Sequence, residues 1–219
     1  MEVHNLGDGH SVINSYMAQL RDVEVQGDRT LFRRNLCRVA RLMAYEVSRT
    51  LSFSDKTVQT PLGTKTVSTY DDRIVVGTVL RAGLAFHEGF LDTFDQADAA
   101  FVAAYREEAE NRSELRIHVD YLAAPRLDGC TFLLVDPMLA TGGSIELSYQ
   151  TFLRHGTPAR LHICCAIAAQ EGVEHLRKVF AGQENVDLWI AALDPQLNEA
   201  AYIVPGLGDA GDLSFGPKL

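Results

Sequence analysis

A chain of 219 residues in which 47% are hydrophobic can bury a sizeable core as one domain, with a small appendage. Its formal net charge of -9 argues against nucleic acid or an anionic membrane surface as a main partner, because both are negatively charged. No stretch reaches the length of an apolar membrane span, and the charged start M-E-V-H-N-L-G-D lacks the features of a signal peptide. We therefore expect a cytoplasmic protein.

Two helices are predicted near the start of the chain. Apolar residues from Ser11 to Val25 recur at helical spacing until Gly27. Asp28 then caps a longer helix that runs to about Ser52. This helix carries a basic cluster that, on an acidic protein, is more typical of a solvated face or an oligomer contact than of an anion site: Arg33, Arg34, Arg38 and Arg41.

A polar, Thr-rich stretch from Lys56 to Val67 contains Pro61 and Gly63, and it predicts an extended arm or hairpin outside the core. The first strong core strand follows, from Arg73 to Leu80.

Arg81 directly follows this strand and precedes a predicted helix from Leu84 to Phe94. An arginine at the end of a buried strand needs a partner, because an unpaired buried charge is costly. A bound diphosphate suits its fork of donors, and a salt bridge to a neighbouring carboxylate is the alternative.

Another apolar strand is predicted from Ala99 to Ala104, and Leu115 to Leu122 returns as its neighbour. The charged segment between them, Glu107 to Arg116, is expected to be a mobile loop because it buries too little apolar surface. It could close as a flap over a bound ligand, with Arg106 at the hinge, or it could be a plain solvated loop.

The stretch from Thr131 to Ile145 organises the chain. Thr131 to Val135 is a nearly continuous apolar run, typical of a strand buried on both faces of a parallel sheet. Asp136 is the first charged residue beyond it, and a helix is predicted from Ile145 to Leu153. Between them lies a turn rich in small residues: Thr141, Gly142, Gly143 and Ser144.

A turn that leads into a helix suits a phosphate, since backbone N–H groups and the positive end of the helix dipole converge there. The hydroxyls of Thr141 and Ser144 add donors, and Asp136 could accept hydrogen bonds from sugar hydroxyls. Gly143 stands where a nucleotide P-loop needs lysine, so that motif is excluded. Any α/β protein has Gly and Ser in such turns, however, so T-G-G-S alone does not decide the function.

The remaining core elements are a strand from Arg160 to Ala168, a helix from Glu171 to Phe180 and a last strand from Asp187 to Ala192. The alternation predicts an α/β fold with a doubly wound, mainly parallel sheet flanked by helices. The four cysteines, Cys37, Cys130, Cys164 and Cys165, are expected to be reduced and structural. His162 and His175 are expected to be structural or surface residues and not bases.

Beyond Ala192 the periodicity disappears. Tyr202 to Gly216 is rich in glycine, which predicts backbone exposed for close approach and neither a helix nor a regular strand. Apolar residues within it, such as Ile203 and Phe215, indicate an ordered hood over the site.

Several of these stretches together resemble one family. D-P-M-L-A-T-G-G-S, from Asp136 to Ser144, resembles the phosphoribosyl diphosphate (PRPP) loop of type I phosphoribosyltransferases in the form that uracil phosphoribosyltransferases use. L-R-A-G-L from Leu80 to Leu84 resembles the family's pyrophosphate loop, and T-P-L-G from Thr60 to Gly63 its arm. Y-I-V-P-G-L-G-D-A-G-D, from Tyr202 to Asp212, resembles its uracil-binding loop. The resemblance covers roughly residues 28 to 216.

The chain departs from the family pattern in four places. Glu107 stands where Asp is usual after Arg106, and A-Q-E-G from Ala169 to Gly172 replaces A-P-E-G. Leu213 replaces an arginine, and the chain ends P-K-L from Pro217 to Leu219.

The resemblance implies a single phosphoribosyltransferase domain over residues 1–219. Its core would span about 70–192, and its hood would come from the N-terminal helices and 193–219. The implied reaction joins uracil and PRPP to give UMP and diphosphate, in pyrimidine salvage. Mg²⁺ is expected to arrive on PRPP without a direct protein ligand. A homodimer through the arm at Thr60, or a larger homo-oligomer, is expected, and activation by a nucleotide effector is left open.

The resemblance also assigns site residues. Catalytic roles fall to Arg81, Arg106 and Asp209, with Asp209 as the candidate that assists proton loss from uracil N1. The base would contact Ile203, Gly208, Asp209 and Ala210. PRPP would bind Arg81, Arg106, Asp136, Pro137, Met138, Leu139, Ala140, Thr141, Gly142, Gly143, Ser144 and Asp209.

Two alternatives remain at this stage. The chain could transfer another base, or it could be a regulator that senses PRPP or UMP and has lost turnover.

Overall fold

A computed structural model describes residues 1–107 and 116–217, with side chains for 1–103 and 120–217. Within these ranges seven strands form one sheet in the order β1-β11-β9-β7-β4-β5-β6. Neighbouring strands are parallel except for the β5–β6 pair, which is antiparallel. In chain order they are β1 (Glu2–Asn5), β4 (Ile74–Val79), β5 (Asp98–Glu107), β6 (Arg116–Ala123), β7 (Thr131–Val135), β9 (Arg160–Cys165) and β11 (Val186–Ile190).

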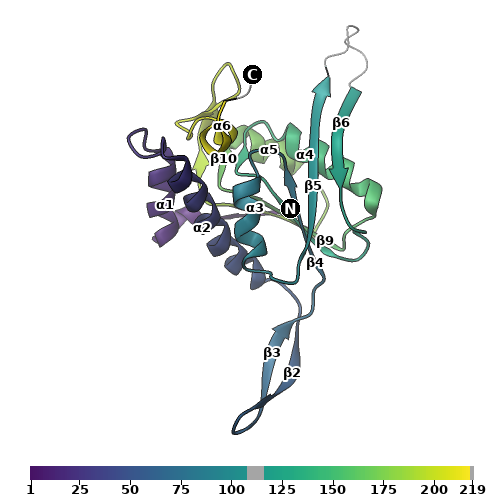
Figure 1. Ribbon diagram of the computed structural model, residues 1–219. Coiled ribbons are helices and arrows are strands. Elements are labelled where there is room, and N and C mark those ends of the chain that lie inside the picture. Colours follow the sequence, from purple (N-terminus) through teal and green to yellow (C-terminus); the bar gives the residue numbers. More distant parts are fainter. Residues whose placement is uncertain (108–115, 218–219) are drawn as a thin grey trace.

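Helices cover both faces of this sheet (Figure 1). One face packs against α1 (Val12–Arg21), α2 (Arg29–Ser48) and α3 (Leu84–Leu91), and the other against α4 (Gly143–Phe152) and α5 (Gln170–Val179). Short 3-10 turns are η1 (Leu6–Asp8) and η2 (Leu153–His155). The predicted doubly wound α/β fold is confirmed.

Cys164 and Cys165 illustrate why the sheet needs two layers of helices. Successive side chains of a strand point to opposite faces. Cys164 accordingly belongs to the core beneath α1 and α2, and Cys165 to the core beneath α4 and α5. Both thiols are fully buried and free, and burial raises their pKa values well above the ordinary range, so they are inert packing groups, as predicted.

The long second helix begins where its capping residue predicts. The side chain of Asp28 accepts hydrogen bonds from the backbone N–H groups of Thr30 and Leu31, which would otherwise lack partners in the first helical turn. Three arginines of its basic cluster have partners within the protein: Arg33 contacts Ser214, Arg41 contacts Asp92, and Arg38 has partners near it in the N-terminal helices. Arg38 donates to Asn35 and lies over the ring of Tyr16.

The predicted strand from Arg160 to Ala168 is in fact two strands. β9 ends at Cys165, and β10 (Ile167–Ala169) joins a small parallel sheet in the order β12-β10-β8, with β8 (Met138–Leu139) and β12 (Leu193–Asp194). The sequence could not show this break because both strands are completely buried, so the apolar run is continuous.

The prediction that the tail contains neither helix nor strand is wrong. β13 (Gln196–Leu197) pairs with β14 (Ile203–Val204), and α6 (Ala210–Phe215) follows. The Asp209 side chain caps this helix by accepting a hydrogen bond from Asp212 N at 2.9 Å. Arg33 of α2 donates to the carbonyl oxygen of Ser214 at 2.6 Å, which ties α6 to the N-terminal helices.

The predicted arm is confirmed as a hairpin of β2 (Phe53–Thr60) and β3 (Gly63–Tyr70). Figure 1 shows it projecting from the body, away from the C-terminal segment. The predicted flap from Glu107 to Arg116 lies mostly outside the described residues, which end at Glu107 and resume at Arg116. Strand β5 continues to Glu107, three residues past its predicted end at Ala104.

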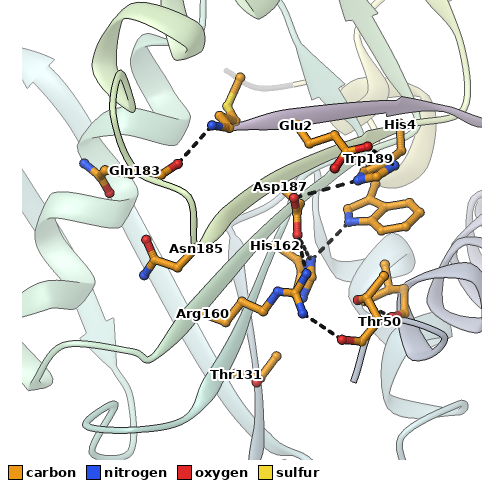
Figure 2. A network of polar contacts seen from close by, with 12 residues as sticks. Glu2, His4, Thr50, Thr131, Arg160, His162, Gln183, Asn185, Asp187 and Trp189 are labelled. Carbon is orange, nitrogen blue, oxygen red and sulfur yellow. Dashed lines mark hydrogen bonds and ion pairs between the residues drawn. The ribbon is translucent and has the colours of Figure 1, made fainter. Parts of the chain in front are cut away.

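A polar network holds the edge strand β1 against the sheet (Figure 2). His4 stacks on Trp189, with 3.9 Å between ring centroids. Asp187 lies between His4 Nε2 at 3.8 Å and Arg160 Nη2 at 2.9 Å. The fully buried His162 accepts a hydrogen bond from Trp189 Nε1 at its Nδ1, and burial lowers its pKa to about 4. It is a neutral structural group, as predicted.

Among the described residues, no helix combines the length and hydrophobicity that a bilayer span requires.

Candidate active site

Three segments that lie far apart in the sequence meet at one cavity of about 600 Å³. They are the turn after β4, the loop after β7 and the start of α6 with the residue before it. Thr78 of β4 pairs with Val135 of β7, so the residues that follow these strands emerge at the same edge of the sheet. The lining residues are Val79, Leu80, Arg81, Ala82, Asp136, Met138, Leu139, Ala140, Thr141, Gly142, Ser144, Ile145, Asp209 and Gly211.

The loop after β7 leads directly into the start of α4. Gly142 precedes the helix in the left-handed conformation, with φ of +85°, and no side chain caps the helix there. Thr141 Oγ1 lies 3.4 Å from Gly143 N. A helix start of this kind presents backbone N–H groups and positive potential, and Thr141, Gly142 and Ser144 line the cavity beside it. The residues that the sequence predicts for a phosphate thus lie together at this helix start, and their role in binding stays a prediction.

Asp136 is the first residue after β7 and is almost completely buried at the cavity wall. Its Oδ1 accepts a hydrogen bond from Met138 N at 3.1 Å. Burial raises the pKa of Asp136 to about 7, and this hydrogen bond only partly opposes the shift. The carboxyl group is therefore divided between its neutral and charged forms near neutral pH.

Arg81 lines the cavity at the end of β4, where the sequence places it. Its Nη2 donates to Asp212 Oδ1 and to the carbonyl oxygen of Gly216, both at 3.2 Å. Of the two partners predicted for Arg81, a diphosphate or a neighbouring carboxylate, the structure shows the carboxylate. The Arg81 side chain is 39% exposed, and its other N–H groups leave donors for an anion in the cavity.

The tail contributes Asp209 and Gly211 to the cavity wall. Asp209 thus shares the cavity with Thr141, a juxtaposition that the sequence predicts across 68 positions of the chain. The other predicted base contacts flank Asp209 without being among the lining residues. Ile203 and Ala210 are buried, and Gly208 is exposed.

Some predicted residues are not placed at the wall. Pro137 and Gly143 belong to the loop but are not among its lining residues, and the Arg106 side chain lies outside the described part. Five lining residues were not predicted: Val79, Leu80, Ala82, Ile145 and Gly211. Each lies in or next to one of the motifs that resemble the family, so closeness to these motifs in the sequence could have predicted them.

Leu213 stands where the family pattern has arginine. It packs against the apolar core beneath α1 and α2, and its Cδ1 lies 3.6 Å from the position that a Cβ at Gly208 would occupy. The departure therefore places an apolar side chain beneath the loop.

The architecture is the phosphoribosyltransferase fold. A hypoxanthine phosphoribosyltransferase from Staphylococcus aureus shares the fold, with a TM-score of 0.50 at 9% identity over 75% of this chain and 76% of that one. The AQ2163 protein from Aquifex aeolicus is much more similar, with a TM-score of 0.83 at 31% identity over 98% of both chains.

Sequence comparison narrows the class. The uracil phosphoribosyltransferase family model matches residues 8–217. A uracil phosphoribosyltransferase from Porphyromonas gingivalis is 48% identical over the full length of both chains. One from Methanothermobacter thermautotrophicus is 37% identical over 86% of this chain and 85% of its own. The chain belongs to the uracil phosphoribosyltransferase family, and the two alternatives are not favoured.

The raised pKa of Asp136 makes a prediction about stability. The folded chain keeps a proton on Asp136 up to pH of about 7, whereas the unfolded chain loses it near the ordinary value of 3.8. The stabilising contribution of the neutral group is complete below pH of about 4 and is lost as pH rises toward 7. Asp136→Asn, which keeps an acceptor for Met138 N, avoids this loss.

We expect Asp136→Asn to gain about 3 kcal/mol of unfolding free energy relative to the unmodified chain between pH 5 and pH 8, since about two pH units of the titration fall in this interval and each corresponds to about 1.4 kcal/mol. Urea unfolding of both chains at the two pH values measures this gain. A constant difference would contradict it.

Proposed function

We infer that this chain is a uracil phosphoribosyltransferase that joins uracil to PRPP and releases UMP and diphosphate. The observation that carries this conclusion is the convergence of the Asp136–Ser144 loop, the Leu80–Leu84 loop and the Tyr202–Asp212 loop at one cavity, in a chain that matches the family over residues 8–217. We place the reaction in pyrimidine salvage in the cytoplasm.

The loop after β7 holds the ribose phosphate in this proposal. Residues from Leu139 to Ser144 bind the 5′-phosphate at the start of α4, where N–H groups and the helix dipole favour an anion. Asp136 accepts hydrogen bonds from ribose hydroxyls, and the backbone of Pro137 and Met138 completes that wall. Ligand hydroxyls favour the charged form of Asp136, which in their absence has only the Met138 N–H as a partner among the described residues.

Arg81 and Arg106 stabilise the departing diphosphate. Arg81 is already in the cavity, and its contacts with Asp212 and Gly216 hold it in place before the anion arrives. Mg²⁺ fits the cavity because two carboxylates, Asp136 and Asp209, line it. When bound on the diphosphate, the ion supplies further positive charge to the leaving group, and we propose no direct protein ligand for it.

The tail reads the base. Uracil has two carbonyl acceptors and an N–H between them, so backbone N–H and C=O groups can recognise its edge without a charged side chain. We assign this role to Ile203, Gly208, Asp209 and Ala210. Cytosine would be rejected because its edge exchanges a donor for an acceptor and would leave buried groups unpaired.

Catalysis is then mainly positioning and electrostatics. The bond from ribose C1 to the diphosphate oxygen breaks, its electron pair leaves with the diphosphate, and uracil N1 bonds to C1. The proton of N1 must leave, and Asp209 is our candidate to assist because it lines the cavity and belongs to the segment that we assign to the base. The N-terminal helices and residues 193–219 form the hood, and the core spans about 70–192.

The decisive test is UMP formation from uracil, PRPP and Mg²⁺. Arg81→Ala should lower kcat/KM by about 100-fold or more, the usual cost of losing one donor to developing charge. Asp209→Asn should lower kcat while keeping the cap of α6, since asparagine also caps helices. Arg126→Ala is the matched control, because Arg126 is exposed and pairs with Asp128 outside the cavity.

Turnover of another base in place of uracil would favour a transferase of different specificity. Retained PRPP binding without UMP would favour a regulator.

Close packing behind the phosphate loop gives a second prediction. A Cβ at Gly172 would lie 2.3 Å from the carbonyl oxygen of Ala140, so Gly172→Ala must displace the loop. We expect the KM for PRPP to rise about tenfold or more, because small misplacements of binding groups are costly. Gly9→Ala is the control, since no atom lies within 4 Å of its Cβ position and its φ is -92°. An unchanged KM in Gly172→Ala would contradict the assigned phosphate site.

We also propose that the β2–β3 arm joins two copies in a homodimer. The two strands pair with each other along their length, and Leu62 at the tip is fully exposed. Such an apolar tip suits burial against a partner. Leu62→Asp should shift the mass in sedimentation from dimer toward monomer. Val23→Asp, at another exposed apolar residue away from the arm, should not. Equal masses for all three chains would contradict an arm-mediated dimer.

A further inference from the structure

An ion pair outside the cavity lining holds the turn at Gly206, which lies between the proposed uracil contacts Ile203 and Gly208. Arg21, the last residue of α1, makes a two-pronged contact with Asp194 of β12, in which Nη1 and Nη2 each donate to a carboxylate oxygen at 2.7 Å. Both backbone polar groups of Gly206 join this pair. Gly206 N donates to Asp194 Oδ2 at 2.8 Å, and its carbonyl oxygen accepts from Arg21 Nη1 at 3.0 Å.

The pair is shielded from solvent. The side chain of Asp194 is 6% exposed and that of Arg21 is 25% exposed. Burial opposes ionisation of Asp194, but the Arg21 guanidinium and the Gly206 N–H outweigh it, and they hold the pKa of the carboxyl below its ordinary value. The group is therefore charged at neutral pH, and it makes stronger hydrogen bonds than a neutral acid would.

The backbone conformation at Gly206 requires glycine. Its φ is +65°, and a Cβ there would lie 2.0 Å from the carbonyl oxygen of Ile203, so no other residue fits this tight turn. The turn lies between Ile203 and Gly208, two of the residues that we assign to the base. Its position therefore decides where the base-reading groups lie.

The ion pair also ties this turn to the phosphate loop. Asp194 pairs with Ala169 of β10, and the adjacent Ala168 pairs with Leu139 of β8. The three short strands thus connect the turn at Gly206 with the loop that starts at Asp136. Neither Arg21 nor Asp194 is among the residues that line the cavity.

We propose that Arg21 and Asp194 are positioning residues that set the uracil-reading loop at a fixed distance from the phosphate loop. This proposal rests on the function inferred above. The two residues touch no reacting atom. They act through the peptide groups of Gly206, so their loss disturbs the base side of the cavity more than the phosphate side, which α4 and β7 build independently.

The test compares the KM values of the two substrates. Arg21→Met should raise the KM for uracil about tenfold or more and change that for PRPP by less than about threefold, since a misplaced binding loop weakens the one substrate that it contacts. Arg21→Lys keeps the positive charge but loses the two-pronged guanidinium contact, so its KM for uracil should lie between those of Arg21→Met and the unmodified chain. Asp194→Asn should raise the KM for uracil in the same way. Arg41→Met is the matched control, because Arg41 pairs with Asp92 between α2 and α3, away from the tail.

Deuterium exchange gives a readout that is independent of activity. The peptide that spans Ile203 to Asp209 should exchange faster in Arg21→Met than in the unmodified chain, whereas the peptide that spans β7 should not change.

Equal increases in both KM values, or an unchanged KM for uracil with unchanged exchange, would overturn the positioning role. If the unmodified chain forms no UMP, the proposed function fails, but the exchange measurement still decides whether the pair holds the turn.

Discussion

The parallel pairing of β4 with β7 is the constraint on which the site depends. Both strands are almost entirely buried, so their polar continuations can begin only where the strands end. Because the strands are parallel, Arg81 and Asp136 emerge at the same edge. A cation and a carboxyl group therefore line one cavity although Arg81 and Asp136 are 55 positions apart in the sequence. The tail adds Asp209 and Gly211 to the cavity wall that the turns after β4 and β7 form.

The two charged groups of the cavity, Asp136 and Arg81, have different kinds of partner. Among the described residues, the Asp136 side chain has only the backbone N–H of Met138 to offset its burial, so it is only partly ionised near pH 7. Arg81, in contrast, already contacts a carboxylate of the tail. A PRPP molecule would supply what each group lacks, namely hydroxyl donors for the acid and a diphosphate for the arginine. The cavity thus offers complementary groups to a polyanion despite the overall acidity of the chain.

Much of this arrangement could be predicted from local patterns. The strand Thr131–Val135 was predicted residue for residue, and Asp28 was recognised as a helix cap, because burial and capping leave clear signals in neighbouring residues. The elements that were missed depend on distant partners. Strand β1 has only four residues and depends on its pairing with β11. Helix α6 is short, and it is stabilised by Asp209, which caps its start, and by Arg33 of α2, which donates to Ser214. The Arg21–Asp194 ion pair joins residues that are 173 positions apart, and no local sequence pattern predicts it.

The edge strand β1 has a consequence for how the chain acquires its shape during synthesis. Glu2 is paired in register with Asp187, so β1 leaves the ribosome long before its partner strand β11 has been made. Until residue 190 has emerged, the Trp189 ring that stacks on His4 is absent, and β9 presents an unpaired edge. Contacts of such long sequence separation form slowly, and open strand edges invite association between chains. The nascent chain therefore passes through a stage in which its sheet is nearly complete but one hydrogen-bonding edge still lacks its partner.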